Sequence, residues 1–109
     1  MHTVVIRSKI LARHPWVAMN LFQAFEEAKR RSLARALTLN AARFPIPWYT
    51  SQAMRARELF GPDFWPYGIE ANRPTLEAFL NCAYEQGVAQ CRLKVEELFP
   101  REVQSSHKE

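Results

Sequence analysis

The sequence predicts a mainly helical chain within an α/β fold, in which one strand is followed by four or five helices. Three observations lead to this prediction. A run of β-branched residues near the start is typical of a strand, apolar residues recur at helical spacing through most of the remainder, and prolines separate the helical stretches. The 109 residues are 48% hydrophobic and 24% charged, which is the composition of one ordinary globular unit.

The predicted strand covers residues 2–7, where Thr3, Val4, Val5 and Ile6 follow one another without polar alternation. Such a run suits a strand that is covered on both faces. A single strand leaves backbone donors and acceptors unpaired, so it must pair outside these 109 residues or with its own copy in a dimer. The pattern therefore indicates a chain that is incomplete as a self-sufficient α/β domain.

Two helices are expected next. Ser8 is a candidate N-cap for a short helical turn that stops before Pro15, and Pro15 opens the longest helix, which runs to about Leu37. The apolar stripe predicted along this helix consists of Val17, Leu21, Ala24, Phe25 and Ala28. Its basic cluster is interpreted as a solvated face and consists of Lys29, Arg30, Arg31 and Arg35.

The second half alternates prolines with helices. Residues 44–49 are expected to be extended, a helix to run from Thr50 or Ser51 to Phe60, and residues 62–74 to form an ordered aromatic loop. A further helix is predicted from Pro74 to Gly87, and a last one over residues 95–99. The core face predicted for the first of these two consists of Leu76, Phe79, Leu80 and Ala83. Residues 1–103 are taken as a single segment and residues 104–109 as a disordered tail.

Charge and composition exclude several classes of protein. Residues 1–61 carry ten Lys and Arg against three acids (+7), and residues 62–109 carry five against eight (−3), which gives +4 overall. This modest excess, with helices separated by proline-rich loops instead of tight turns, argues against a nucleic-acid partner. The absence of a long apolar run or a secretory signal predicts a cytoplasmic chain with no membrane partner. Cys82 and Cys91 match no zinc or disulfide framework, so no metal site is expected.

No familiar catalytic motif is present, which leaves two groups of candidate residues. His2 lies at the start of the predicted strand, where side chains often reach a cleft at a sheet edge. Trp65, Tyr67, Glu70 and Arg73 combine apolar rings, a hydroxyl, a carboxylate and a guanidinium within nine residues, a mixture that suits a small aromatic anion. The structural alternative is that the rings anchor the loop and that Glu70 pairs with Arg73 at the surface.

Several stretches resemble the C-terminal part of the 4,5-dihydroxyphthalate decarboxylase family. They are WPYGIEANRPTLEAFLNCAYEQG at residues 65–87, HTVVIR at residues 2–7, Pro15-Trp16-Val17 and the closing VEELF at residues 95–99. The resemblance implies a type II periplasmic-binding-protein-like architecture, with two α/β lobes around a cleft, of which this chain is the C-terminal segment. Lys94 departs from the family, whose members tend to have a capping Thr or Ser there, and residues 44–61 fit it only loosely.

The resemblance also implies a function, the non-oxidative decarboxylation of a dihydroxylated aromatic acid by a carboxy-lyase. It suggests His2 and Glu70 as catalytic residues and Arg73, Tyr67 and Trp65 as substrate-binding residues; no metal ligand is assigned, and the cofactor is unknown. The partner is a small aromatic carboxylate, and the chain alone is expected to be inactive and to form a homo-oligomer or contact the missing lobe. The alternative is a substrate-binding protein of the same fold that captures a small aromatic acid or metabolite without catalysis.

Overall fold

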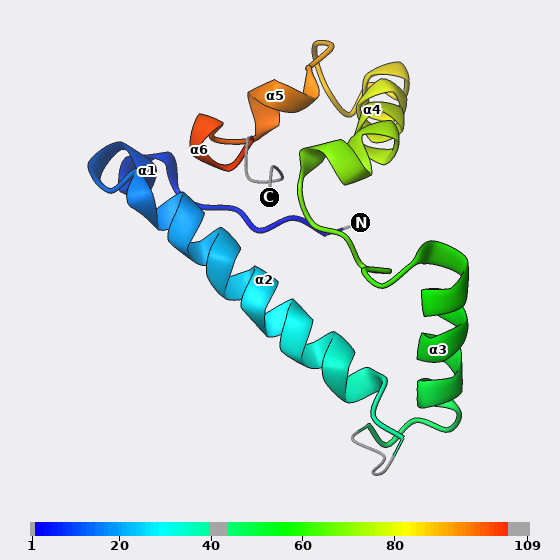
Figure 1. The fold of residues 1–109 in the computed structure, drawn as a ribbon. Coiled ribbons are helices and arrows are strands. Elements are labelled where there is room, and N and C mark those ends of the chain that lie inside the picture. The colour runs from blue at the N-terminus through cyan, green and yellow to red at the C-terminus, as the bar shows by residue number, and fades with distance from the viewer. Residues whose placement is uncertain (1, 40–43, 105–109) are drawn as a thin grey trace. The chain divides into compact units, whose positions relative to one another are not determined.

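The computed structural model describes residues 2–39 and 44–104, and its regular structure over these ranges is helical (Figure 1). The helices of the described ranges are α1 (Ser8–Arg13), α2 (Trp16–Ala36), α3 (Tyr49–Phe60), α4 (Ile69–Glu85), α5 (Val95–Leu98) and α6 (Arg101–Gln104). The chain divides into unit 1, which is Met1–Phe22 with Tyr67–Glu109, and unit 2, which is Gln23–Pro66. The tail predicted to be disordered lies, from residue 105 on, outside the described residues.

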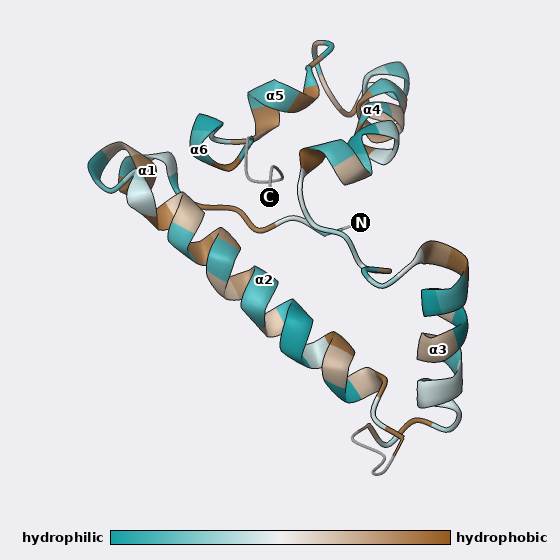
Figure 2. Cartoon of the chain, viewed as in Figure 1, coloured by the Kyte–Doolittle hydropathy of each residue, from teal (hydrophilic) through white to brown (hydrophobic). Residues whose placement is uncertain are grey.

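The predicted strand is wrong, and with it the α/β fold and the two-lobe architecture that the resemblance implied. Residues 2–7 belong to no strand or helix, and the described residues contain no strand at all. Val4 is 64% exposed and Val5 is 91% exposed, on the hydrophobic segment that precedes α1 in Figure 2. A β-branched run forms a strand only when a second strand accepts its backbone hydrogen bonds, and no described residue offers one.

The first two helices follow the prolines as expected. α1 ends at Arg13, and α2 begins at Trp16, directly after Pro15. Ser8 is not the N-cap of α1 but its first residue, because Arg7 occupies the capping position and its carbonyl accepts the amide of Ile10 at 2.8 Å. Proline therefore places the break between these helices correctly, since it supplies no amide hydrogen to continue the first one.

The buried side of α2 differs from the predicted stripe. Leu21 and Phe25 of that stripe are 37% and 42% exposed, whereas Ala18, Lys29 and Ala36 are buried. The interpretation of Lys29 as part of a solvated face is therefore wrong, although Arg30, Arg31 and Arg35 are exposed as expected. Hydrophobic periodicity predicts which side of a helix is apolar, but it does not say whether a neighbour is present to cover that side.

α3 begins slightly earlier than predicted, at Tyr49, because Trp48 adopts the left-handed conformation (φ 57°) at the capping position. It ends as predicted before Gly61, whose φ of 90° favours glycine and whose amide donates to the carbonyl of Arg57 at 2.9 Å. Ala53 is the buried residue of this helix.

α4 starts at Ile69, five residues before the predicted start, so that Pro74 lies inside the helix. Proline has no amide hydrogen, so the carbonyl of Glu70 lacks its usual donor four residues on. The buried cluster of unit 1 consists of Ile69, Leu76, Leu80 and Val95, with Phe99 packed against it. The prediction of Leu76 and Leu80 as core is confirmed, but Phe79 is 59% exposed because it lies away from the centre of that face.

Candidate functional site

Arg73 is the centre of the polar contacts of unit 1. It lies on α4, three residues after Glu70, a spacing that places the two side chains on the same face of the helix. Its Nη2 donates to Glu70 Oε1 at 2.6 Å and its Nε donates to Glu70 Oε2 at 3.2 Å. The guanidinium and the carboxylate thus face each other with two parallel hydrogen bonds, the strongest arrangement for this pair of groups.

Two further carboxylates approach the same guanidinium. Glu96 Oε1, on α5, lies 2.8 Å from Arg73 Nη2, and Glu77 Oε1, one turn along α4, lies 3.7 Å from Nη1. We call these four residues, Glu70, Arg73, Glu77 and Glu96, the Arg73 cluster. Since Glu96 belongs to α5, the cluster connects α4 to α5, which also share the buried apolar cluster that contains Leu76 and Val95.

The ionisation of the cluster follows from these contacts. The hydrogen bond from Arg73 lowers the pKa of Glu70 below its usual range. The pKa of Glu96 is also lowered, first by a hydrogen bond from its own backbone and then by Arg73. In return, the hydrogen bonds to Glu70 and Glu96 raise the pKa of Arg73. At neutral pH, Glu70 is therefore an ionised hydrogen-bond acceptor and not a proton donor.

The charge balance decides what the cluster can do. One guanidinium against three carboxylates leaves a surplus of two negative charges, and the carboxylate side chains are about half exposed or more. An incoming substrate carboxylate has to compete with Glu70 and Glu96 for the Arg73 donors and meets this negative surplus. Arg73 links α4 to α5 through its contact with Glu96. A contact between Arg73 and a substrate stays a prediction.

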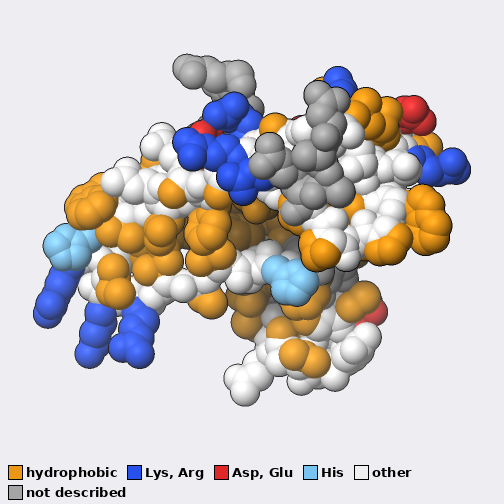
Figure 3. Space-filling view, turned by 90° about the horizontal axis from the view of Figure 1, so that it is seen from below, with side chains coloured by type: hydrophobic (Ala, Val, Ile, Leu, Met, Phe, Trp, Pro, Cys, Tyr) orange, Lys and Arg blue, Asp and Glu red, His pale blue; other side chains and the backbone are white. Residues whose placement is uncertain are grey.

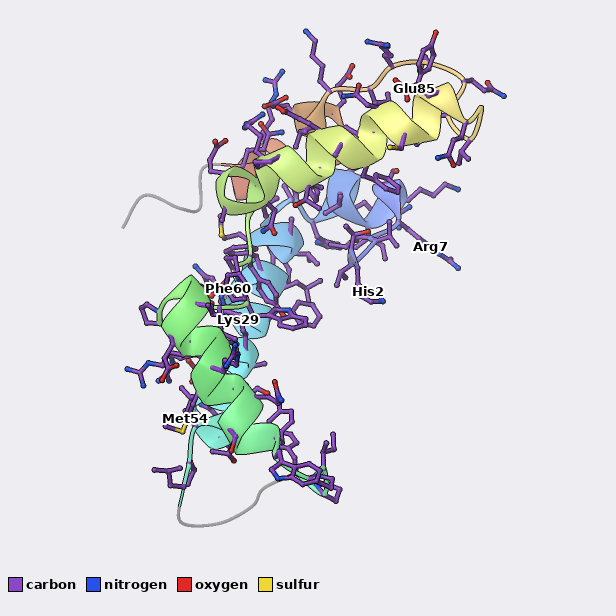
Figure 4. The ribbon with its side chains drawn as sticks, turned by 90° about the vertical axis from the view of Figure 1, so that its right-hand side faces the viewer. His2, Arg7, Lys29, Met54, Phe60 and Glu85 are labelled. Carbon is purple, nitrogen blue, oxygen red and sulfur yellow. The ribbon has the colours of Figure 1, made fainter. Side chains whose placement is uncertain are left out.

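The other predicted site residues are placed separately. His2 is exposed on the segment before α1, as its label in Figure 4 shows, and no described hydrogen bond or ion pair joins it to Glu70 or Arg73. Tyr67 is half-buried in unit 1. Trp65 belongs to unit 2 and is 64% exposed, and its amide donates to Asp63 Oδ1 at 3.4 Å. Of the five predicted residues, the structure brings together Glu70 and Arg73.

Two members of the cluster were not among the predicted site residues. Glu77 follows Arg73 by four residues, so helical spacing alone would have found it. Glu96 gives no such signal, because its contact depends on how α5 packs against α4.

Lys94 departs from the expected capping residue, yet α5 keeps half of a capping box, since the Lys94 amide donates to Glu97 Oε2 at 2.6 Å.

Lys29 forms the buried charge of unit 2 and is labelled in Figure 4. Its side chain is only 7% exposed, and its ammonium lies 2.9 Å from Asp63 Oδ2 and 3.1 Å from Glu26. Burial is the largest influence on its pKa and lowers it, but the hydrogen bonds to Asp63 and Glu26 outweigh burial, so the pKa is raised. The charged amine therefore ties α2 to the loop after α3 and is not a neutral nucleophile.

Two properties of residues 2–39 and 44–104 bear on other classes of site. No group of three His, Cys, Asp or Glu is placed so that it could share a metal ion. No helix in this part of the chain combines the length and the apolar character needed to cross a membrane.

The sequence is similar to a 4,5-dihydroxyphthalate decarboxylase of Comamonas testosteroni, with 35% identity over 99 residues. The aligned region is 91% of this chain but 30% of the decarboxylase, so the chain spans about a third of the length of this relative. No protein-family model matches the sequence, and no solved structure matches it. The similarity supports a relation to that decarboxylase, and this part of the predicted resemblance is confirmed.

Proposed function

We propose that this chain supplies part of a protein that decarboxylates a dihydroxylated aromatic acid without oxidation. The observation that carries the proposal is the 35% identity to the Comamonas testosteroni decarboxylase across 91% of this chain. Because the match covers 30% of that protein, the proposal assigns a portion of the reaction centre to these residues. Turnover by this chain alone is not expected.

The reaction exchanges a carboxylate for a proton. The ring carbon that bears the carboxylate accepts the proton, the bond to the carboxylate carbon breaks, its electron pair returns to the ring, and carbon dioxide leaves. Ring hydroxyls favour the protonation because they donate electron density to that carbon. The site must therefore supply a proton donor, hydrogen-bond acceptors for the ring hydroxyls, and cationic or polar groups for the carboxylates.

The candidate residues divide among these roles. His2 is the proposed proton donor. Glu70, whose pKa is lowered by Arg73, is the proposed acceptor for a ring hydroxyl. Arg73, whose side chain is about one third exposed, is the proposed partner of a substrate carboxylate, and Tyr67 is proposed to line the aromatic ring.

The test is a chimera in which this chain replaces the matching region of the Comamonas testosteroni decarboxylase. The chimera is supplied with 4,5-dihydroxyphthalate, and carbon dioxide and the dihydroxybenzoate product are measured. We expect the chimera to convert the substrate. We expect a His2→Ala chimera to fold and to bind the substrate but not to convert it. A chimera that folds and binds substrate without turnover contradicts the proposed reaction and indicates capture of an aromatic acid without catalysis.

Arg73 needs its own control, because it also links α4 to α5. Arg73→Lys keeps a cation but loses the parallel hydrogen bonds to Glu70. A substrate-binding role predicts a raised KM in the Arg73→Lys chimera, in addition to any loss of thermal stability from the missing hydrogen bonds. A fall in stability with an unchanged KM contradicts that role.

A further inference from the structure

Helix α1 and its capping residue carry an uncompensated cationic patch. Arg7, Lys9 and Arg13 are all exposed, and none of them forms an ion pair with the described residues. We call these three residues the α1 patch. In Figure 3, Lys and Arg side chains gather at the left edge of the face, where α1 lies in Figure 1.

The patch has no acidic neighbour in the sequence. The first acidic residue of the chain is Glu26, so no carboxylate within or beside α1 in sequence can neutralise it. Lys9 and Arg13 are four residues apart on α1, where two like charges on the same helix face repel each other. An anionic group that approaches from outside the helix relieves this repulsion.

The same unit carries a surface of the opposite sign. The Arg73 cluster has three carboxylates around one guanidinium, and its acidic side chains are exposed to between 47% and 64%. Exposed apolar side chains accompany both surfaces. Ile10 is 43% and Trp16 is 61% exposed on and just after α1, and Phe79 is 59% exposed on α4.

We propose that the partner of these surfaces is a second copy of this chain, with the α1 patch of each copy on the Arg73 cluster of the other. Charge complementarity favours this partner, because one copy presents both signs that the other needs. In a two-fold dimer the contact is made twice. A polyanion such as nucleic acid satisfies the α1 patch alone and leaves the Arg73 cluster without a partner. The dimer contact covers Glu70 and Arg73, the side chains that the proposed function assigns to a substrate, so the two proposals are alternatives at this cluster and are tested separately.

Two charge-reversed variants and their mixture test the contact. Variant A carries Lys9→Glu and Arg13→Glu, and variant B carries Glu70→Lys and Glu77→Lys. Arg55→Glu with Arg57→Glu is the matched control, because it changes the net charge as variant A does at exposed positions of α3. Light scattering gives the mass of each chain, and circular dichroism confirms that each variant keeps its helices.

For the unaltered chain, we expect twice the monomer mass of 12.7 kDa at low salt. We expect the monomer at about 1 M salt, where the Debye length falls to about 3 Å. Variants A and B should each be monomeric at low salt, the control should remain dimeric, and the mixture of A with B should regain the dimer. A monomer at low salt, an oligomer that ignores salt, or a mixture that stays monomeric overturns the proposal.

Discussion

Removing the carboxylate of Asp63 should destabilise unit 2 far more than its half-exposed position suggests. Asp63 lies 2.9 Å from the Lys29 ammonium, whose side chain is 7% exposed, so Asp63→Ala leaves a desolvated cation without its partner from the loop after α3. Breaking a fully buried ion pair costs about 3–5 kcal/mol, and losing one charged hydrogen bond costs about 1.5–3 kcal/mol. Because Glu26 still faces the ammonium at 3.1 Å, we expect the lower range, about 1.5–3 kcal/mol.

A second substitution separates this explanation from a general loss of packing, because the buried charge predicts that the second substitution raises stability. Lys29→Met in the Asp63→Ala background removes the buried charge and keeps a side chain of similar length, so the double variant should be more stable than Asp63→Ala alone. Asp63→Asn retains an acceptor for the Trp65 amide and controls for the loss of that turn. Urea unfolding monitored by circular dichroism gives each free energy. A double variant less stable than Asp63→Ala would refute the reasoning.

Three further predictions use the same unfolding assay. Leu80→Ala should lower the free energy of unfolding by about 2–5 kcal/mol because Leu80 lies in the buried cluster. Phe79→Ala should change it by no more than about 0.5 kcal/mol. Equal losses would contradict the core described above. Gly87→Ala should cost about 1–2 kcal/mol, because Gly87 has a φ of 71°. The added Cβ meets no neighbour, so backbone strain is the whole effect. An unchanged stability would show that this φ is not required. Hydrogen bonds from Arg30 and Arg31 lower the pKa of Glu27 from 4.5 to about 2. The contribution of Glu27 to stability is therefore present above pH 4.5 and is lost as the pH falls towards 2. The difference in stability between the unaltered chain and Glu27→Gln should shrink between these pH values, and a constant difference would argue against the ion pairs.

Helix positions were predictable where prolines and glycines mark the ends. Pro15 separates α1 from α2, and Gly61 ends α3, because these residues act through their own backbone geometry. The start of α4 was missed because Pro74, which usually marks a first turn, is tolerated inside this helix. The strand at residues 2–7 was wrong because strand formation depends on a partner that local sequence does not encode.

The candidate site was predictable only within one helix. Glu70 and Arg73 are three residues apart, so their pairing follows from helix geometry alone. Glu96, and likewise Asp63 beside Lys29, reach their partners across the fold, and no sequence spacing relates them. The burial of Lys29 among polar neighbours on α2 was missed for the same reason, since a basic run is usually solvated.

The proposed function is tested by the rate at which the chimera containing this chain releases carbon dioxide from 4,5-dihydroxyphthalate. We expect a rate well above that of the Comamonas testosteroni decarboxylase from which the matching region has been deleted. A folded chimera whose rate equals that of the deleted protein would contradict the claim that these residues serve a decarboxylase.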